Sequence, residues 1–352
     1  MERENEKNKL LLATAILATA LGTASLNQNV KAETAGVVTG KTLPITKSMI
    51  YTDNDILMPK TTFTFEIAPK VVESADTVDG LKVRAGITEG LVTTTTVAYT
   101  NADKSDKKDK TTLFDFSNVK FTEVGVYRYT VSEQDGAVEG IEYDKKQWTV
   151  DVYVVNGPNG GFEPKYVVSR DSETNDKKPI IFKNSFDTTS LKVTKKVTGN
   201  TGELQKNFTF KLMLKAGECF EAGQIVKLQK SGSTYKIDVT IGKEYQFTLK
   251  NGESIQLDKL PVGISYQLEE VEANKDGYTT TATLKEQGKE KSSDFTLSTQ
   301  NQKTDESADE IVVTNKRDTQ VPTGVVGTLA PFAVLSIVAI GGVIYITKRK
   351  KA

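Results

Sequence analysis

Four strand-like segments occur in the same order in each half of the chain, and this repetition constrains the fold more than any other feature. Each segment alternates apolar residues with other residues, as a strand does whose side chains point in turn to its two faces. In the first half the segments are Leu43-x-Ile45-x-Lys47, Phe63-x-Phe65, Tyr127-x-Tyr129-x-Val131-x-Glu133 and Ile180-x-Phe182-x-Asn184. In the second half they are Leu191-x-Val193-x-Lys195, Phe208-x-Phe210-x-Leu212, Ile264-x-Tyr266-x-Leu268-x-Glu270 and Ile311-x-Val313-x-Asn315. The chain therefore contains two copies of one β domain.

The fold class predicted from this pattern is all-β. Short runs rich in Thr, Val, Ile, Tyr and Phe are separated by Gly, Asn and Asp turns, and no long helical period interrupts them. Strands at this spacing favour immunoglobulin-like β-sandwiches, in which each sheet buries one face and exposes the other. We expect two tandem sandwich domains, over residues 33–185 and 186–319.

The same alternation places a Lys, a Glu and an Asn on the buried face of each domain. A single inward Lys usually lies at a strand end and extends its amine to solvent. Finding the set twice in register instead favours burial of Lys47, Glu133 and Asn184, and again of Lys195, Glu270 and Asn315. Lys196 is the alternative to Lys195, but its position on the strand points outward.

Burial changes the chemistry of these groups. Documented buried lysines have pKa values near 5–6 and buried glutamates near 8–9, because a low dielectric disfavours the charged form. A neutral amine is a nucleophile, while a protonated Glu can donate a hydrogen bond to the Asn carbonyl and relay the proton that the amine loses. The predicted product is a Lys-Asn amide, formed with loss of ammonia.

Composition excludes several other chemistries. The chain has no histidine, which removes the commonest general base and metal ligand, so zinc hydrolase and Ser-His-Asp mechanisms are excluded. Cys219 is the only cysteine, so no internal disulfide can form. The 46 basic and 46 acidic residues balance, which gives no indication of a nucleic-acid partner. We expect no metal and no cofactor.

The two ends of the chain predict export and membrane retention. Residues 1–32 combine an apolar stretch with a small-residue cleavage site at Val30-Lys31-Ala32, as a signal peptide does. At the other end, Gln320-Val321-Pro322-Thr323-Gly324 precedes an uncharged apolar run, 325–347, and a basic tail, 348–352. The run is close to the roughly 20 residues that a membrane-spanning helix needs, and the basic tail favours the cytoplasmic side.

These features resemble two known systems of Gram-positive surface proteins. The pentapeptide resembles the sorting signal that sortases cut between Thr and Gly, in the variant read by pilus-associated sortases. The Lys, Glu and Asn residues resemble those of pilin domains with self-forming isopeptide bonds. That resemblance implies bonds from Lys47 to Asn184 beside Glu133, and from Lys195 to Asn315 beside Glu270.

Over essentially its whole length the chain resembles the sortase-assembled backbone pilins, of the streptococcal T-antigen type with two isopeptide domains. The resemblance implies that a sortase joins Thr323 of one subunit to a lysine of the next. The same resemblance places this lysine seven residues before the bonded Asn, at Lys177, with Lys178 and Lys183 as alternatives. The implied partners are a pilus-associated sortase, identical subunits, minor pilins and cell-wall peptidoglycan, and the implied location is the cell-wall pilus.

Two other function classes fit parts of the sequence. A monomeric wall-anchored adhesin could use the same domains as a stalk, but the sorting-signal variant favours a polymer. A surface enzyme would depend on carboxylates, and the pair Asp309-Glu310 is interpreted as part of a solvated loop rather than as a glycosidase site. Cys219 could form a thioester, yet no distinctive context supports one.

Overall fold

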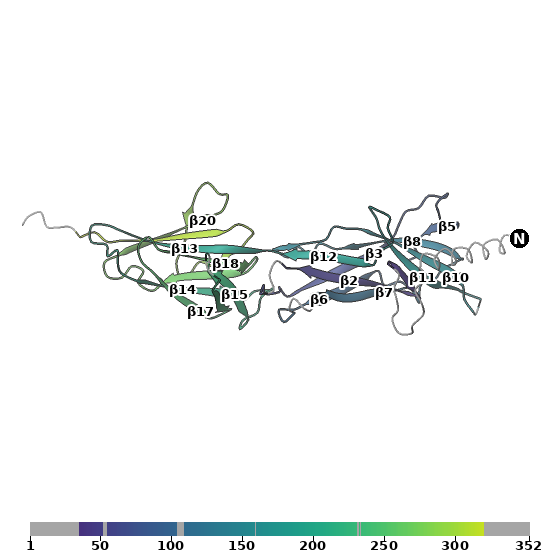
Figure 1. Ribbon diagram of the computed structural model, residues 1–352, viewed down its shortest axis with the longest axis horizontal. Helices are drawn as coiled ribbons and strands as arrows, with labels where there is room; N and C mark the ends of the chain where they lie inside the picture. Colours follow the sequence, from purple (N-terminus) through teal and green to yellow (C-terminus); the bar gives the residue numbers. More distant parts are fainter. Residues whose placement is uncertain are drawn as a thin grey trace, which may run out of the picture.

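The computed structural model describes residues 35–319, except 52–54, 104–108, 159, 231 and 233. The predicted leader, sorting signal, apolar run and basic tail lie outside these residues. Among the described residues, no helix has the length and apolarity needed to cross a membrane. The described chain forms two β domains that lie end to end along the long axis of the molecule (Figure 1).

The first domain packs an eight-stranded sheet against a four-stranded sheet. The larger sheet has the order β1-β11-β10-β8-β3-β6, with β5 beside β8 and β4 beside β5. Its strands are β1 (Val37–Thr39), β3 (Thr61–Pro69), β4 (Thr77–Val78), β5 (Leu81–Ala85), β6 (Thr94–Tyr99), β8 (Gly125–Glu133), β10 (Trp148–Asn156) and β11 (Phe162–Asp171). The smaller sheet has the order β7-β2-β12-β9, with β2 (Thr42–Ile50), β7 (Asp109–Asp115), β9 (Ile141–Glu142) and β12 (Ile180–Phe186).

The second domain repeats this two-layer arrangement. Its larger sheet has the order β16-β15-β18-β13-β23-β20-β21 and its smaller sheet β17-β14-β19-β22. The larger contains β13 (Thr188–Thr198), β15 (Ile225–Lys230), β16 (Lys236–Thr240), β18 (Ser254–Pro261), β20 (Thr279–Glu286), β21 (Ser293–Asp294) and β23 (Asp309–Lys316). The smaller contains β14 (Phe208–Lys215), β17 (Glu244–Leu249), β19 (Ser265–Glu270) and β22 (Gln302–Lys303).

In both domains the strand that carries the Lys is the parallel neighbour of the strand that carries the Asn. In the first domain β2 pairs with β12, and in the second β13 pairs with β23. The burial of both strand pairs alternates residue by residue, as the sequence pattern predicts. Because a strand near the start of each domain lies beside its last strand, residues distant in the sequence meet in one core.

The outer face of the larger sheet in the first domain differs from the prediction. Seven consecutive residues of β10, from Trp148 to Val154, are buried, so this strand is covered on both faces. A second small apolar cluster covers the outer face, made by Leu81, Val83, Val126, Tyr153 and Val168. Two of these residues, Leu81 and Val83, lie on β5, which pairs with β8 in this sheet.

A single residue, Asp187, separates β12 from β13, and the loop before β15 packs against the first domain. The carbonyl oxygen of Cys219 accepts hydrogen bonds from the backbone N–H of Lys60 at 2.8 Å and from Nδ2 of Asn101 at 2.9 Å. Phe220 packs against Phe186, with ring centroids 6.3 Å apart. The half-buried Cys219 thiol has a raised pKa because burial disfavours the thiolate. This environment favours a structural residue at the domain junction over a reactive thiol.

Asp309 also differs from the prediction of a solvated loop. It begins β23, is 5% exposed, and accepts a hydrogen bond of 2.8 Å from the hydroxyl of Tyr266. Burial raises its pKa to about 6, against the lowering effect of the hydrogen bond from Tyr266 and with support from the nearby charges of Glu286 and Asp305. Its neighbour Glu310 does face solvent.

We expect this carboxyl to make the second domain less stable as the pH rises from about 4 to above 6. The folded pKa lies above the unfolded value of about 3.9, so the native state binds more protons in this window. The shift corresponds to about 2–3 kcal/mol, since one pKa unit is about 1.4 kcal/mol. Guanidinium unfolding between pH 4 and 8 should show this slope, and Asp309→Asn should flatten it. An equal slope in both proteins would contradict the assignment.

Candidate cross-linking sites

The first site lies between the two sheets of the first domain. Lys47 on β2 is opposite Phe182 on β12, two residues before Asn184, so both polar side chains point inward from neighbouring strands. Glu133 ends β8 in the facing sheet, opposite Phe65 on β3. The site therefore combines β2 near the start of the domain, the central strand β8 and the last strand β12.

The three side chains of this site are in contact. Nζ of Lys47 lies 2.7 Å from Oε1 of Glu133, and both side chains are 0% exposed. Nδ2 of Asn184, also fully buried, donates a 3.1 Å hydrogen bond to the same Oε1. One carboxylate oxygen thus bridges the amine and the amide nitrogen.

Burial controls the charge of this site. It lowers the pKa of Lys47 to about 8, against the opposing effects of Glu133 and Asp144. It also raises the pKa of Glu133, against the opposing effects of Lys47 and Asn184. The amine lies over the ring of Phe63, 4.4 Å from its centroid. A substantial neutral fraction of the amine is accessible near neutral pH, as nucleophilic attack requires.

The second site repeats the first with the same three residue types. Nζ of Lys195 donates a 2.8 Å hydrogen bond to Oε2 of Glu270, and Nδ2 of Asn315 donates to Oε1. Lys195 and Asn315 are 0% exposed and Glu270 is 2% exposed. Burial lowers the pKa of Lys195. Lys196 is exposed, so Lys195 is the lysine that the fold places inside.

The position of the carboxyl groups differs from the predicted one. Each Glu contacts the amide nitrogen of its Asn and not the carbonyl oxygen. In the first domain Oδ1 of Asn184 instead accepts a 2.9 Å hydrogen bond from the backbone N–H of Asp144. Because a backbone N–H can only donate, this contact fixes the orientation of the amide. The geometry of Glu133 suits proton relay between the two nitrogens.

The candidate acceptor lysines lie between β11 and β12 or on β12 itself. Lys177 is half-buried and forms an isolated antiparallel bridge with Arg170. Lys178 is exposed, lies 3.1 Å from Asp176, and is held by backbone contacts to Ser169. Lys183 is exposed on β12. All three remain accessible on this subunit, and Thr323 lies outside the described residues.

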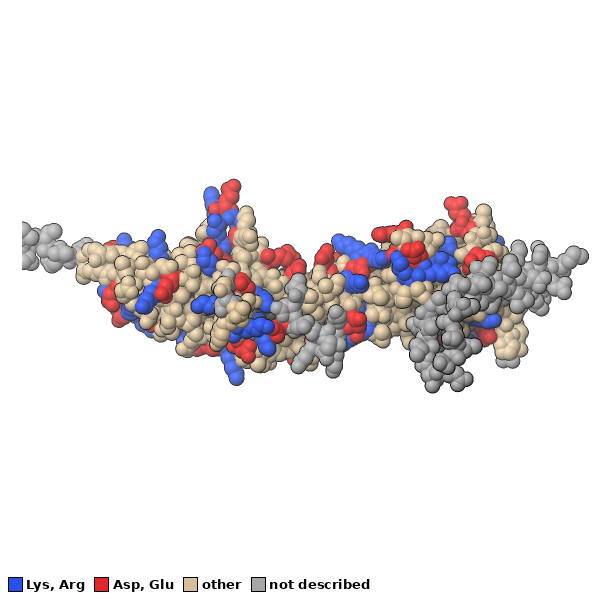
Figure 2. Space-filling view, in the orientation of Figure 1, with Lys and Arg blue, Asp and Glu red and all other residues tan. Residues whose placement is uncertain are grey.

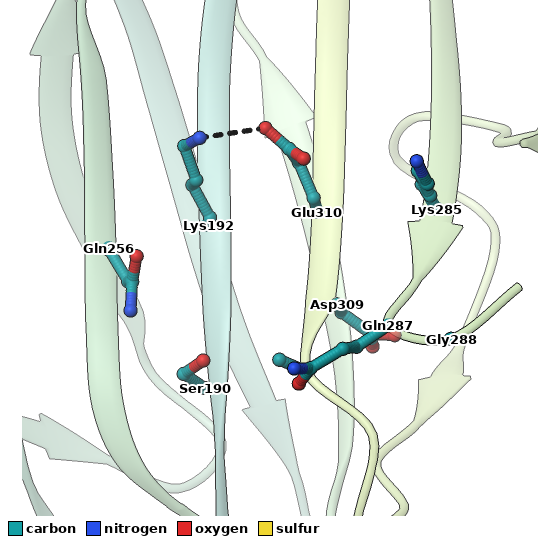
Figure 3. A pocket seen from close by; sticks show the side chains of 9 residues that line it. Ser190, Lys192, Gln256, Lys285, Gln287, Gly288, Asp309 and Glu310 are labelled. Carbon is teal, nitrogen blue, oxygen red and sulfur yellow. Dashed lines mark ion pairs between the residues drawn. The ribbon is translucent and has the colours of Figure 1, made fainter.

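The surface carries open polar hollows. One, of about 430 Å³, lies over β13 and β23 near Asp309 (Figure 3). Lys192 and Glu310 form a 2.9 Å ion pair on its surface rather than converging on a space for substrate. On the face shown in Figure 2, basic and acidic side chains lie close together on both domains. These features are those of a solvated surface.

Comparisons with known proteins agree with a chain of two β domains. A family profile described as a Spy0128-like isopeptide containing domain matches residues 39–187. A second profile, described as a domain of unknown function (DUF7601), matches residues 189–317. The first range ends at Asp187, the residue that links β12 to β13, and the second begins two residues later.

The similarity extends across both domains. A pilin of Streptococcus pyogenes serotype M1 is 37% identical over 324 residues, which are 90% of this chain and 93% of that protein. The structures of the S. pyogenes major pilins T-13 and T3.2 are 58% and 57% identical, with TM-scores of 0.71 and 0.75. Each comparison covers 81% of this chain and 100% of the pilin structure.

Fold and sites together define a protein of two tandem β-sandwiches, each with a buried Lys, Glu and Asn. The relatives are structural subunits rather than enzymes. The chain belongs to the family of streptococcal major pilins.

Proposed function

We propose that this protein is the backbone subunit of a covalently polymerised pilus on the cell surface, and that each domain is locked by a self-formed Lys-Asn amide. The observation that carries the proposal is the pair of buried Lys, Glu and Asn sites in a chain of the major pilin family. The proposed domains are 33–185 and 186–319. Similarity to major pilins favours this function over a monomeric wall-anchored adhesin.

The cross-linking reaction follows from the contacts in each site. The neutral amine of Lys47 attacks Cγ of Asn184, and a carbon–nitrogen bond forms. The carboxyl of Glu133 gives its proton to Nδ2, which leaves as ammonia when the bond from Cγ to Nδ2 breaks. Glu133 then takes up the proton that Nζ loses, so the carboxyl is regenerated. Lys195, Asn315 and Glu270 have the same roles in the second domain.

The termini supply the assembly signals in this proposal. Residues 1–32 direct export, and residues 325–352 hold the chain at the membrane until a pilus-associated sortase cuts between Thr323 and Gly324. The thioacyl enzyme then transfers the Thr323 carbonyl to Lys177 of the next subunit. Minor pilins and cell-wall peptidoglycan are the other proposed partners, and the last subunit of a fibre ends on the wall.

Polymerisation tests this function directly. We expect the wild-type chain, incubated with its sortase, to give a ladder of covalent multimers on a denaturing gel. Lys177→Ala should abolish the ladder, because no other amine then occupies the acceptor position. Lys178→Ala and Lys183→Ala are the matched controls and should polymerise. A ladder from Lys177→Ala and none from a control would reassign the acceptor. A wild-type chain that the sortase cuts but does not polymerise would favour the adhesin.

A further inference from the structure

The carbonyl oxygens of the two reacting asparagines have different surroundings. In the first domain the backbone N–H of Asp144 donates a 2.9 Å hydrogen bond to Oδ1 of Asn184. In the second domain Oδ1 of Asn315 is buried and has no hydrogen-bond partner among the described residues. The two sites are otherwise built from the same residue types in the same register. One site therefore has a donor that the other lacks.

Attack by the lysine places negative charge on this oxygen. When Nζ of Lys47 bonds to Cγ of Asn184, the electron pair of the carbonyl bond moves to Oδ1. It returns when the bond from Cγ to Nδ2 breaks and ammonia leaves. A fixed donor aimed at Oδ1 stabilises the charged intermediate more than the starting amide, and in a buried site this effect is large.

We propose that the backbone N–H of Asp144 is the oxyanion donor for the first cross-link, and that the carboxylate of Asp144 holds it in place. This inference rests on the proposed function, since it concerns the rate of the proposed amide formation. The N–H touches a reacting atom and is catalytic, whereas the carboxylate is a positioning group.

The carboxylate of Asp144 fastens its own backbone to the strand that carries Asn184. Oδ2 accepts a 2.9 Å hydrogen bond from the backbone N–H of Lys183, the residue before Asn184. Oδ1 accepts a 2.9 Å hydrogen bond from the backbone N–H of Lys146 and so closes a tight turn. These two contacts fix the distance between the donor and Oδ1 of Asn184.

Strand topology explains why the second domain lacks an equivalent donor. In the first domain the short strand β9 pairs with β12 only at Ser185 and Phe186, so the chain beyond β9 leaves its N–H groups available. In the second domain the corresponding neighbour is β20, which pairs with β23 along eight residues and lies opposite Asn315 at Thr280. The N–H groups of such a paired strand take part in the ladder instead of reaching the Asn side chain.

The inference predicts a faster first cross-link within one molecule. Residues 33–323 would be made in a short pulse of cell-free synthesis, sampled over time and quenched in acid. Peptide mass spectrometry then gives the linked fraction of each domain, and the second bond is an internal reference. Asp144→Pro removes the N–H, and loss of one oxyanion donor typically costs about 100-fold or more in rate. We expect the first bond, and not the second, to slow by that factor.

A second variant separates positioning from electrostatics. Asp144→Ala keeps the N–H but loses both anchoring contacts, and we expect about a tenfold lower rate at pH values well above the pKa of Lys47. Removing the nearby charge should also move the pH midpoint of the reaction downward, because Asp144 raises the pKa of Lys47. A purely electrostatic role would speed the reaction near neutral pH and leave the high-pH rate unchanged.

The outcomes are distinguishable. A wild-type rate for the first bond in Asp144→Pro would overturn the inference while leaving the proposed function intact. If circular dichroism or limited proteolysis finds that this variant does not fold, the high-pH rate of Asp144→Ala decides, and an unchanged rate overturns the inference. A wild-type chain that forms neither bond would overturn the proposed function, and this inference with it.

Discussion

Glu270→Ala should leave the second domain without its cross-link and lower its melting temperature by roughly 15 °C or more. The bond between Lys195 and Asn315 would close a loop of about 120 residues, and the chain-entropy model assigns about 4–5 kcal/mol to such a loop. In a domain of this size one kcal/mol corresponds to about 3–4 °C. The variant also leaves the amine of Lys195 buried without the carboxylate of Glu270, which lowers the stability of the second domain further.

Two measurements check this result. Intact-mass spectra of residues 33–323, made without sortase, should give two lost ammonias for the wild type and one for Glu270→Ala. Calorimetry of Glu270→Ala should then show the second-domain transition at a lower temperature and the first-domain transition unchanged. Glu269→Ala, on the same strand but facing the other side, is the matched control and should retain both losses and both transitions. A Glu270→Ala chain that still lost two ammonias would refute the role of Glu270 in proton relay.

The alternation of side chains was sufficient to place the Lys, Glu and Asn residues of both sites on buried faces. A strand has a side-chain period of two, so the apolar partners of Lys47 and Asn184 determine which face those residues share. The same argument placed Lys195 inside and Lys196 outside. The alternation, however, shows which face of the sheet a side chain is on and not which atoms it contacts. It therefore could not show that Glu133 contacts the amide nitrogen rather than the carbonyl oxygen.

Other features had weaker signals or none. The N–H of Asp144 is a backbone group, and no residue type marks it as a donor to Asn184. Asp309 was assigned to a loop because a carboxylate next to another carboxylate is usually solvated, yet a single hydroxyl, that of Tyr266, accompanies it into the core. The double burial of β10 had only a weak signal, because two of its three outward residues, Thr149 and Asp151, are polar. Ion pairs with arginines accompany the burial of Asp151.

In the proposed fibre, with Lys177 as the acceptor and both amides formed, the position of Lys177 determines which cross-link carries tension. Force that enters a subunit at Lys177 and leaves at Thr323 follows the backbone along β12, through Asp187 and along β13 to Lys195. The amide then carries it to Asn315 and on to the terminus. The remainder of the first domain, including its cross-link to Lys47, lies off this covalent path. Strands enclosed by the second cross-link are shielded.

We therefore expect the two Asn→Ala variants to respond very differently when sortase-made fibres are stretched by single-molecule force spectroscopy. In Asn315→Ala the path must follow about 120 residues that the amide bypassed, so unfolding should lengthen each subunit by about 400 Å at roughly 3.3–3.6 Å per residue. In Asn184→Ala the path from Lys177 to Asp187 still spans about ten residues, so the fibre should lengthen by less than roughly 40 Å per subunit.

A matched control uses the same variants as monomers held at their two termini. Tension then enters the first domain ahead of Lys47, so Asn184→Ala should also extend, by roughly 450 Å for the about 137 residues that its cross-link encloses. Extension of Asn184→Ala by the full length when it is held at its termini, and by less than roughly 40 Å in the fibre, would identify the acceptor as a lysine just before β12 or on it. Equal extension in both geometries would instead place the acceptor ahead of Lys47, and the first cross-link would then bear the load together with the second.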